Sequence, residues 1–230
     1  MSKKKLVKNK GQAVATERYI QYVAAGVVLL VIAFFVWQYL PKQSAAEQTS
    51  LACEQFADIP AADQYESAPP LVVDANTKYF ADFTMENGGT FKVQLYPDKA
   101  PITVNSFIFL SCKGFYEGVT FHRVLEGFMA QGGDPTGTGS GGPGYQFVNE
   151  DSDLTFDKAG VMAMANSGRD TNGSQFFITF DAADFLTGNY TIFGQVVEGM
   201  DVVNGITLRD PDQNPVFEGD KIISVMISEE

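Results

Sequence analysis

The pattern of apolar and polar residues changes twice along the 230-residue chain. Residues 19–40 form an apolar run without a charge, and residues 41–76 are rich in Ala, Gln, Glu, Asp, Ser and Pro without a regular period. From residue 77 onward, short stretches of alternating apolar and polar residues follow one another, separated by Gly, Asn and Asp. Such alternation is typical of β-strands joined by turns. The pattern predicts a basic tail over residues 1–18, a helix over 19–40, a linker over 41–76 and a folded domain over 77–230.

The run from residue 19 to residue 40 is long enough to cross a membrane. Its 22 residues would measure about 33 Å as an α-helix, and Tyr and Trp stand near both ends, where interfacial aromatic side chains are common. The basic tail before it predicts a cytoplasmic N-terminus and an extracytoplasmic domain, in a single-pass protein of the cell membrane. A cleaved signal peptide is the alternative, because Pro41 ends the helix and the small residues Ser44 to Ala46 could form a cleavage site.

Within residues 77–230 the pattern predicts many short strands and two helices. Asn87 and Gly88 stand between two alternating stretches, YFADFTM and TFKVQLY, which predicts a hairpin. Residues 100–114 predict a helix, with a proline in its first turn and a glycine at its end. A second helical segment lies around residues 197–206. Many short strands with two helices favour a mainly β fold, an antiparallel barrel that is closed or orthogonally packed.

Composition and charge exclude several classes of protein. With 45% apolar residues, the chain can bury a large core, so it is not disordered throughout. The net charge is −12, and because residues 1–18 carry about +5, the remainder carries about −17. Such an acidic surface repels phosphate backbones, so we expect no nucleic acid partner. Cys53 and Cys112 could form one disulfide outside the cytoplasm, but nothing in the sequence requires it.

Two motifs superficially match ligand-binding loops. The stretch GGDPTGTGSGGPG contains the spacing G-x-G-x-x-G, but no helix follows it, as a dinucleotide site would need. The stretch DPDQNPVFEGDK begins like a calcium loop, but it lacks the turn glycine and the closing glutamate. The sequence therefore predicts neither a cofactor nor a metal ion.

The motif FHRVL contains the only histidine of the chain, followed by an arginine. A serine hydrolase would need a nucleophile on a sharp turn such as G-x-S-x-G, and the sequence has none. In a strand, His122 and Arg123 point to opposite faces, and we expect His122 to be buried and hydrogen-bonded to the backbone. Arg123 lies in an apolar stretch, where a guanidinium needs a partner or a ligand. Gln131 could hold it by side-chain hydrogen bonds, beside an apolar wall of Phe128 and Met129.

Four longer motifs resemble the cyclophilin family of peptidyl-prolyl isomerases, and they occur in the family's order: APITVNSFIFL, GVTFHRVLEGFMAQGGDP, GVMAMANSGRDTNGSQFFIT and FLTGNYTIFGQVVEGMDVV. The resemblance covers residues 77–230. It implies an eight-stranded antiparallel barrel capped by two α-helices, with a peptide groove on one face. Together with the apolar run, it implies a bacterial-like member whose barrel follows a single N-terminal transmembrane helix and a linker.

Residue by residue, the resemblance also implies a site. Arg123 corresponds to the family's catalytic arginine, and Gln131 corresponds to its supporting glutamine. The substrate-binding positions form the wall and the edge of a proline pocket and contact the flanking peptide. They would be Phe128, Met129, Ala165, Asn166, Gln175, Phe177, Phe185, Leu186 and Tyr190. Phe185 and Tyr190 stand where many members have tryptophan and histidine. The first replacement predicts weak binding of cyclosporin.

The activity implied by the resemblance is peptidyl-prolyl cis–trans isomerisation. We expect a monomer that binds proline-containing peptides and unfolded proteins, needs no metal or cofactor, and assists the folding of exported or membrane-proximal proteins. Arg123 would donate a hydrogen bond to the prolyl nitrogen or to the substrate carbonyl as the amide twists. The alternative is a non-catalytic module that binds proline peptides or acts as a chaperone. A fixed cation favours the enzyme, because a pure binder has no use for it.

Overall fold

The computed structural model describes residues 50–230. Eight strands form one antiparallel sheet in the order β3-β4-β6-β5-β7-β2-β1-β8. The strands are β1 (Tyr79–Met85), β2 (Thr90–Leu95), β3 (Arg123–Leu125), β4 (Met129–Gly132), β5 (Val161–Met164), β6 (Phe176–Thr179), β7 (Ile192–Glu198) and β8 (Ile222–Glu229). The helices are α2 (Leu51–Gln55), α3 (Pro101–Cys112) and α4 (Met200–Asn204), with 3-10 turns at Asp184–Leu186 and Pro211–Gln213.

The first hairpin shows how local sequence produces the sheet. In β1, side chains alternate between buried and half-buried positions, as the apolar-polar alternation predicts. Asn87 accepts a hydrogen bond from the backbone N–H of Gly89 at 2.9 Å, and Gly88 adopts a φ of +82°, which glycine allows without strain. Phe83 and Phe91 face each other across the two strands with stacked rings 4.5 Å apart. The turn residues and the aromatic pair therefore fix the register.

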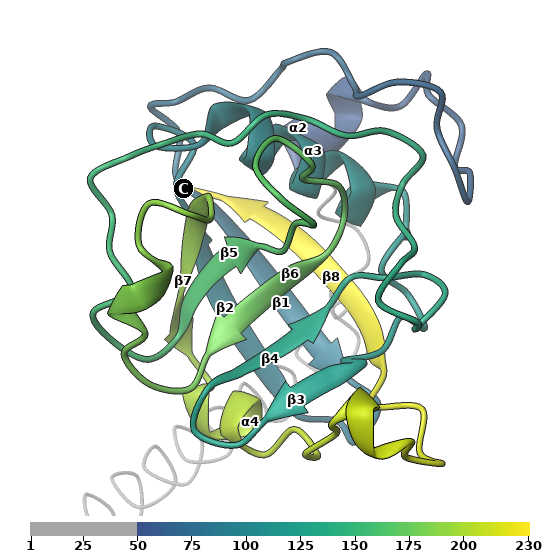
Figure 1. Cartoon of the computed structure of the whole chain (residues 1–230). Coiled ribbons are helices and arrows are strands. Elements are labelled where there is room, and N and C mark those ends of the chain that lie inside the picture. The colour runs from purple at the N-terminus through teal and green to yellow at the C-terminus, as the bar shows by residue number, and fades with distance from the viewer. Residues whose placement is uncertain (1–49) are drawn as a thin grey trace, which may run out of the picture. The chain divides into compact units, whose positions relative to one another are not determined.

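The sheet curves so that its two edge strands, β3 and β8, approach each other. Isolated bridges join Thr120 to Lys221 and Val124 to Arg209 near this seam. The result is a half-barrel with α3 at one end and α4 at the other (Figure 1). The prediction of a mainly β fold with eight antiparallel strands and a few helices is confirmed at this level.

The helix α3 covers one end of the half-barrel. Pro101 occupies its first turn, and the carboxylate of Glu150 accepts hydrogen bonds from the backbone N–H groups of Ile102 and Thr103, at 2.9 and 2.8 Å. Glu150 therefore supplies, from a distant loop, the cap that the preceding Ala100 cannot provide. The helix predicted over residues 100–114 is present. The one predicted around residues 197–206 is a single short helix, α4.

The core is built on aromatic rings. Phe107 of α3 lies 5.2 to 5.9 Å, between ring centroids, from Tyr116, Phe193 and Phe176. Phe83 of β1 lies 5.9 Å from Phe176 of β6. These side chains are fully or almost fully buried. They hold the helix and both halves of the sheet around one apolar centre.

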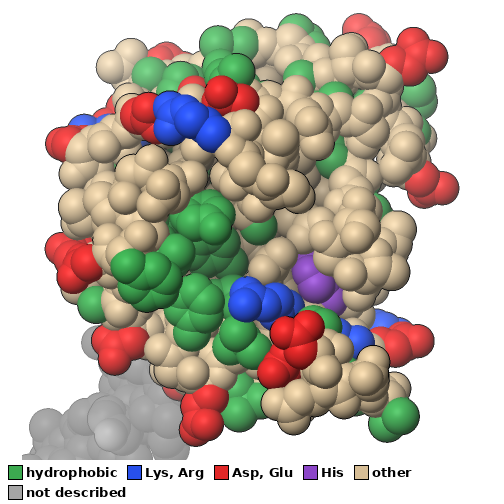
Figure 2. Space-filling view, viewed as in Figure 1, with side chains coloured by type: hydrophobic (Ala, Val, Ile, Leu, Met, Phe, Trp, Pro, Cys, Tyr) green, Lys and Arg blue, Asp and Glu red, His purple; other side chains and the backbone are tan. Residues whose placement is uncertain are grey.

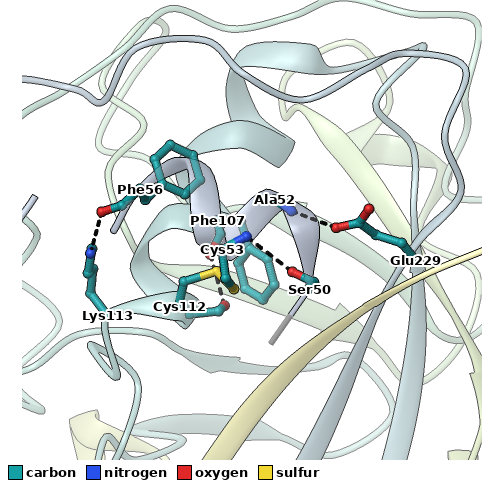
Figure 3. Close-up of a disulfide and its surroundings, with 9 residues drawn as sticks. Ser50, Ala52, Cys53, Phe56, Phe107, Cys112, Lys113 and Glu229 are labelled. Carbon is teal, nitrogen blue, oxygen red and sulfur yellow. Dashed lines mark hydrogen bonds between the residues drawn. A yellow bond between two sulfur atoms is a disulfide. The ribbon is translucent and has the colours of Figure 1, made fainter. Parts of the chain in front are cut away.

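Residues 50–76, which the composition assigned to a linker, pack against the end of the barrel that carries α3. A disulfide joins Cys53 of α2 to Cys112 of α3, with the Cα atoms 5.4 Å apart (Figure 3). Phe56 is fully buried, and its ring centroid lies 5.2 Å from that of Phe109. The sequence allowed this disulfide without requiring it, because the two cysteines are 59 residues apart and no local pattern pairs them.

Residues 1–49, including the tail and the apolar run at 19–40, lie outside the described residues. Within residues 50–230, no helix combines the length and the apolar composition that a membrane crossing requires. The longest helix there, α3, has 12 residues and measures about 18 Å, against a hydrocarbon core of about 30 Å. The predicted location, a single-pass cell-membrane protein with an extracytoplasmic domain, is therefore corrected, since the described chain provides no membrane-spanning helix.

Candidate active site

The hairpin of β3 and β4 positions the central residues of the site. A tight turn at residues 126–128 joins the strands, and Gly127 adopts a φ of +66° there. The register of the hairpin places Arg123 directly opposite Gln131. Facing residues in an antiparallel pair project to the same side of the sheet. Both side chains therefore belong to one surface, as the sequence predicts.

Arg123 carries an unpaired positive charge. Its side chain is half-buried, and within residues 50–230 no carboxylate forms an ion pair with it. Its Nη1 atom donates to the sulfur of Met129 at 3.7 Å, and its Cζ atom lies 6.0 Å from the ring centroid of Phe128. A thioether is a weak acceptor. Most of the hydrogen-bonding capacity of the guanidinium is therefore available to a ligand.

Gln131 makes a different contact from the one predicted. Its Nε2 atom donates to Oε1 of Gln175 at 3.0 Å, and Nε2 of Gln175 donates to the carbonyl of Gly141 at 2.9 Å. Within the described chain, no hydrogen bond joins Gln131 to Arg123. The two amides thus form a relay from β4 to the glycine-rich loop, because Gln175 and Gly141, though distant in sequence, lie within reach.

A pocket of about 90 Å³ opens beside Arg123. Its lining consists of Arg123, Phe128, Met129, Gln131, Ala165, Asn166, Phe177, Leu186 and Tyr190. Figure 2 shows hydrophobic side chains gathered on this face of the molecule, next to a basic side chain. The structure thus brings together nine of the eleven residues that the sequence predicts for the site. A small apolar recess with one cation at its edge is suited to a compact, uncharged ring.

The two remaining predicted residues lie next to this pocket. Gln175 lines a neighbouring groove, and Phe185 lies outside the pocket lining with 70% of its surface exposed. The Phe185 ring centroid is 5.7 Å from that of Phe128. Phe185 therefore extends the apolar surface beyond the pocket.

The floor of the pocket depends on a residue that sequence reasoning missed. Phe156 is fully buried, and its ring stacks on Phe177 with centroids 5.7 Å apart. Tyr190 meets Phe177 edge-on at 5.4 Å. Phe177 is thus held between two rings. Phe156 comes from an irregular stretch whose polar neighbours gave no indication of a buried aromatic side chain.

A second, larger groove of about 520 Å³ adjoins the pocket and shares Gln131, Ala165 and Asn166 with it. The loop over residues 139–146 forms much of its wall, and Gln64 of the N-terminal segment lines it as well. No Asp, Glu, Lys or Arg is among the lining residues that the described chain contributes. The groove is therefore a neutral, polar extension of the apolar pocket.

The comparisons with known proteins agree with this geometry. The family model for cyclophilin-type peptidyl-prolyl cis–trans isomerases matches residues 80–227. The chain belongs to the cyclophilin family. Peptidyl-prolyl cis-trans isomerase B of Bacillus subtilis (strain 168) is 43% identical over 138 residues, which cover 60% of this chain and 96% of that protein. Peptidyl-prolyl cis-trans isomerase-like 1 of Homo sapiens is 49% identical over 134 residues, which cover 56% and 81%.

A solved structure supports the same fold. The crystal structure of a Cryptosporidium parvum cyclophilin-type peptidyl-prolyl cis-trans isomerase has a TM-score of 0.60 and 34% identity, covering 66% of this chain and 99% of that one. Bacterial and eukaryotic cyclophilins resemble the chain to a similar degree, so the likeness establishes the family and the enzyme class, peptidyl-prolyl cis–trans isomerase.

In this cyclophilin, the glycine-rich loop is organised by one carboxylate. Asp134 is buried and accepts hydrogen bonds from the backbone N–H groups of Thr136, Gly139 and Gly141, at 2.7, 2.6 and 3.1 Å. Burial alone would raise the pKa of Asp134, but these hydrogen bonds outweigh it and hold the pKa below its usual value. The G-x-G-x-x-G spacing thus belongs to a loop folded around a carboxylate.

His122 is buried, with 2% of its surface exposed, and it is absent from the lining of the pocket. Burial lowers its pKa, which favours the neutral imidazole. Within the described chain, neither ring nitrogen has a hydrogen-bond partner of good geometry, although a backbone contact with Thr120 partly offsets the effect of burial on the pKa of His122. Its own carbonyl accepts from Arg209. The histidine is therefore buried and does not line the pocket beside Arg123.

Proposed function

We propose that the chain accelerates rotation about X–Pro bonds in proline-containing peptides and unfolded proteins, with Arg123 as the catalytic residue. The observation that carries this proposal is the free guanidinium of Arg123, half-buried beside a small apolar pocket. A buried or half-buried cation without a partner is costly unless a ligand uses it. The substrate amide is the ligand that best matches this position.

The chemistry requires neither a nucleophile nor a metal ion. Rotation about an amide bond meets a barrier of about 18–20 kcal/mol, because the twisted form loses its resonance. In that form the prolyl nitrogen regains a lone pair, to which a charged donor binds more strongly than to the planar amide. Arg123 supplies this donor to the prolyl nitrogen or to the substrate carbonyl. Lowering the barrier by about 5 kcal/mol would accelerate rotation several thousandfold.

The surrounding residues position the substrate. The proline ring would enter the pocket and pack against its apolar side chains, which are Phe128, Met129, Phe177, Leu186 and Tyr190. Ala165 and Asn166 lie at the junction between the pocket and the groove. If this junction binds the peptide on one side of the X–Pro bond, that side stays fixed while the part of the peptide on the other side rotates.

Gln131 and Gln175 act as positioning residues. Their amides are joined to each other and to the carbonyl of Gly141. These hydrogen bonds hold the two glutamine side chains in one conformation at the boundary between the pocket and the groove. The peptide would therefore meet Arg123 in a constant geometry.

The comparisons are consistent with a proline-containing ligand. A second structure of the Cryptosporidium parvum relative, with a TM-score of 0.59 and 34% identity, was determined in the presence of the dipeptide Ala-Pro. The role in exported or membrane-proximal proteins depended on residues 19–40 alone, and the described residues give no support for it. The proposed clients are therefore defined by their exposed X–Pro bonds.

The test compares two arginine variants of the full chain by NMR exchange spectroscopy on an X–Pro tetrapeptide. Arg123→Ala should lower kcat/KM by about 10²- to 10³-fold, the usual cost of losing one charged donor to a transition state. Arg169→Ala is the matched control, because Arg169 is exposed and pairs only with Asp151. Equal turnover by wild type and Arg123→Ala would refute the mechanism. Peptide binding by wild type without faster exchange would instead identify a non-catalytic module.

A further inference from the structure

The N-terminal segment, residues 50–76, lies before the part of the chain that the family model matches, which begins at residue 80. It nevertheless contributes Gln64 to the lining of the groove next to the proline pocket. The other lining residues all come from residues 131–175. Gln64 is thus an addition to the groove that the barrel alone would not provide.

Gln64 and the neighbouring backbone of Tyr65 contact the glycine-rich loop. Its Nε2 atom donates to the carbonyl of Gly142 at 3.3 Å, and the backbone N–H of Tyr65 donates to the carbonyl of Pro143 at 2.7 Å. The backbone of residue 65 passes so close to Gly144 that a Cβ atom there would lie 2.5 Å from the carbonyl oxygen of Tyr65. The segment and the glycine-rich loop are therefore in direct backbone contact.

The segment is in turn attached to the helix α3. The ring centroid of Tyr65 lies 4.8 Å from that of Phe109. The ammonium group of Lys113 donates to the carbonyl of Phe56 at 2.5 Å, and the disulfide joins α2 to the end of α3 (Figure 3). These attachments lie at the end of the barrel where α2 and α3 meet (Figure 1). An exposed glutamine side chain is thereby held at a defined place instead of moving with a free chain.

We propose that Gln64 is a specificity-determining residue that favours substrates with a neutral, hydrogen-bonding side chain beside the X–Pro unit. With Nε2 directed to Gly142, its Oε1 atom has no hydrogen-bond partner within the described chain and is available to a donor. The groove contains amides, hydroxyls and backbone groups but no charged side chain from the described residues. A glutamine or asparagine side chain of the substrate matches these groups, whereas an aliphatic one of equal size leaves them without partners.

The test rests on the proposed function. It uses two pairs of X–Pro peptides, and the members of each pair differ only by Gln or Leu at one position. In one pair this position precedes the X–Pro unit, and in the other it follows the unit. Gln and Leu are close in size, so the ratio of their kcat/KM values reports polarity. We expect wild type to prefer Gln on one side of the X–Pro unit. Gln64→Ala and the nearly isosteric Gln64→Met should lower this ratio by about three- to tenfold, mainly through KM.

Gln55→Ala is the matched control, because Gln55 is an exposed glutamine of the same segment that does not line the groove. A ratio that is unchanged in both Gln64 variants, or that falls equally in Gln55→Ala, would overturn the inference. Absence of turnover by wild type would instead overturn the proposed function. In that case the same peptide pairs, titrated by NMR, would give a ratio of Kd values, and an equal ratio in wild type and Gln64→Met would again reject the role of Gln64.

Discussion

Opening the disulfide between Cys53 and Cys112 should lower the free energy of unfolding by about 4 kcal/mol. The bridge closes a loop across a sequence separation of 59 residues, which includes β1, β2 and most of α3. In the chain-entropy description, a loop of this length restricts the unfolded chain by about 14 cal/mol/K, which is about 4 kcal/mol at 25 °C. For a domain of this size, that corresponds to a fall in Tm of roughly 8–16 °C.

The folded state keeps most of its contacts when the bridge opens, so the loss resides mainly in the unfolded chain. With the bridge formed, Phe56 is buried against Phe109 and Ser50 accepts from the backbone N–H of Cys53 at 3.2 Å, and neither contact uses the sulfur atoms. The carboxylate of Glu229 also holds the start of α2, accepting from the backbone N–H of Ala52 at 2.7 Å (Figure 3). The reduced protein should therefore fold to the same structure with a lower Tm.

The assay is thermal unfolding of the full chain followed by circular dichroism, with and without dithiothreitol. A thiol titration confirms that the bridge is open. The control is the double variant Cys53→Ala/Cys112→Ala, whose Tm should be low and should not respond to dithiothreitol. If opening the bridge shifts the Tm of the wild type by less than about 2 °C, the restriction of the unfolded chain is not what the disulfide contributes.

Two further predictions concern the glycine-rich loop. Because the pKa of Asp134 is depressed, its ionised form contributes stability that is present above its unfolded pKa, about 3.9, and is lost as pH falls through the lower folded pKa. Urea denaturation should therefore show a steeper acid loss in wild type than in Asp134→Asn, and parallel curves would contradict this. Gly144→Ala should cost about 1–3 kcal/mol, because the added Cβ meets Tyr65. Gly142→Ala, whose Cβ would meet nothing within 4 Å, should cost less than about 0.5 kcal/mol in the same assay.

The sequence predicted those parts of the fold that depend on short-range patterns. The first hairpin follows from alternation and an Asn-Gly turn, and α3 follows from its proline and its apolar spacing. Arg123 and Gln131 were placed on one surface because a tight turn joins their strands. In each case, the residues that interact are close together along the chain.

The parts that the sequence did not predict depend on contacts between distant residues. The Nε2 atom of Gln131 donates to Gln175, which is 44 residues away, and within the described chain no hydrogen bond joins Gln131 to Arg123. Phe156 packs under Phe177 from a stretch without periodicity. Residues 50–76 look like a linker because their composition is polar. A few buried side chains and a disulfide hold residues 50–76 against the barrel, and such contacts cannot be inferred from amino-acid composition.

The substrate likewise has a constant part, the X–Pro unit, and a variable part, the residues that flank it. Every X–Pro substrate presents the same ring and the same amide, and the pocket that we propose binds them is built from β3, β4, β6 and the segments around them. Substrates differ in the flanking residues, and part of the groove that would meet them comes from outside the family region. Gln64 reaches the groove only while its segment lies on α3, and the packing of Phe56 and Tyr65 against Phe109 holds the segment there. The same packing therefore holds the residue that we propose selects among substrates. Freeing the segment should therefore alter the preference for flanking residues while the pocket around Arg123 remains assembled.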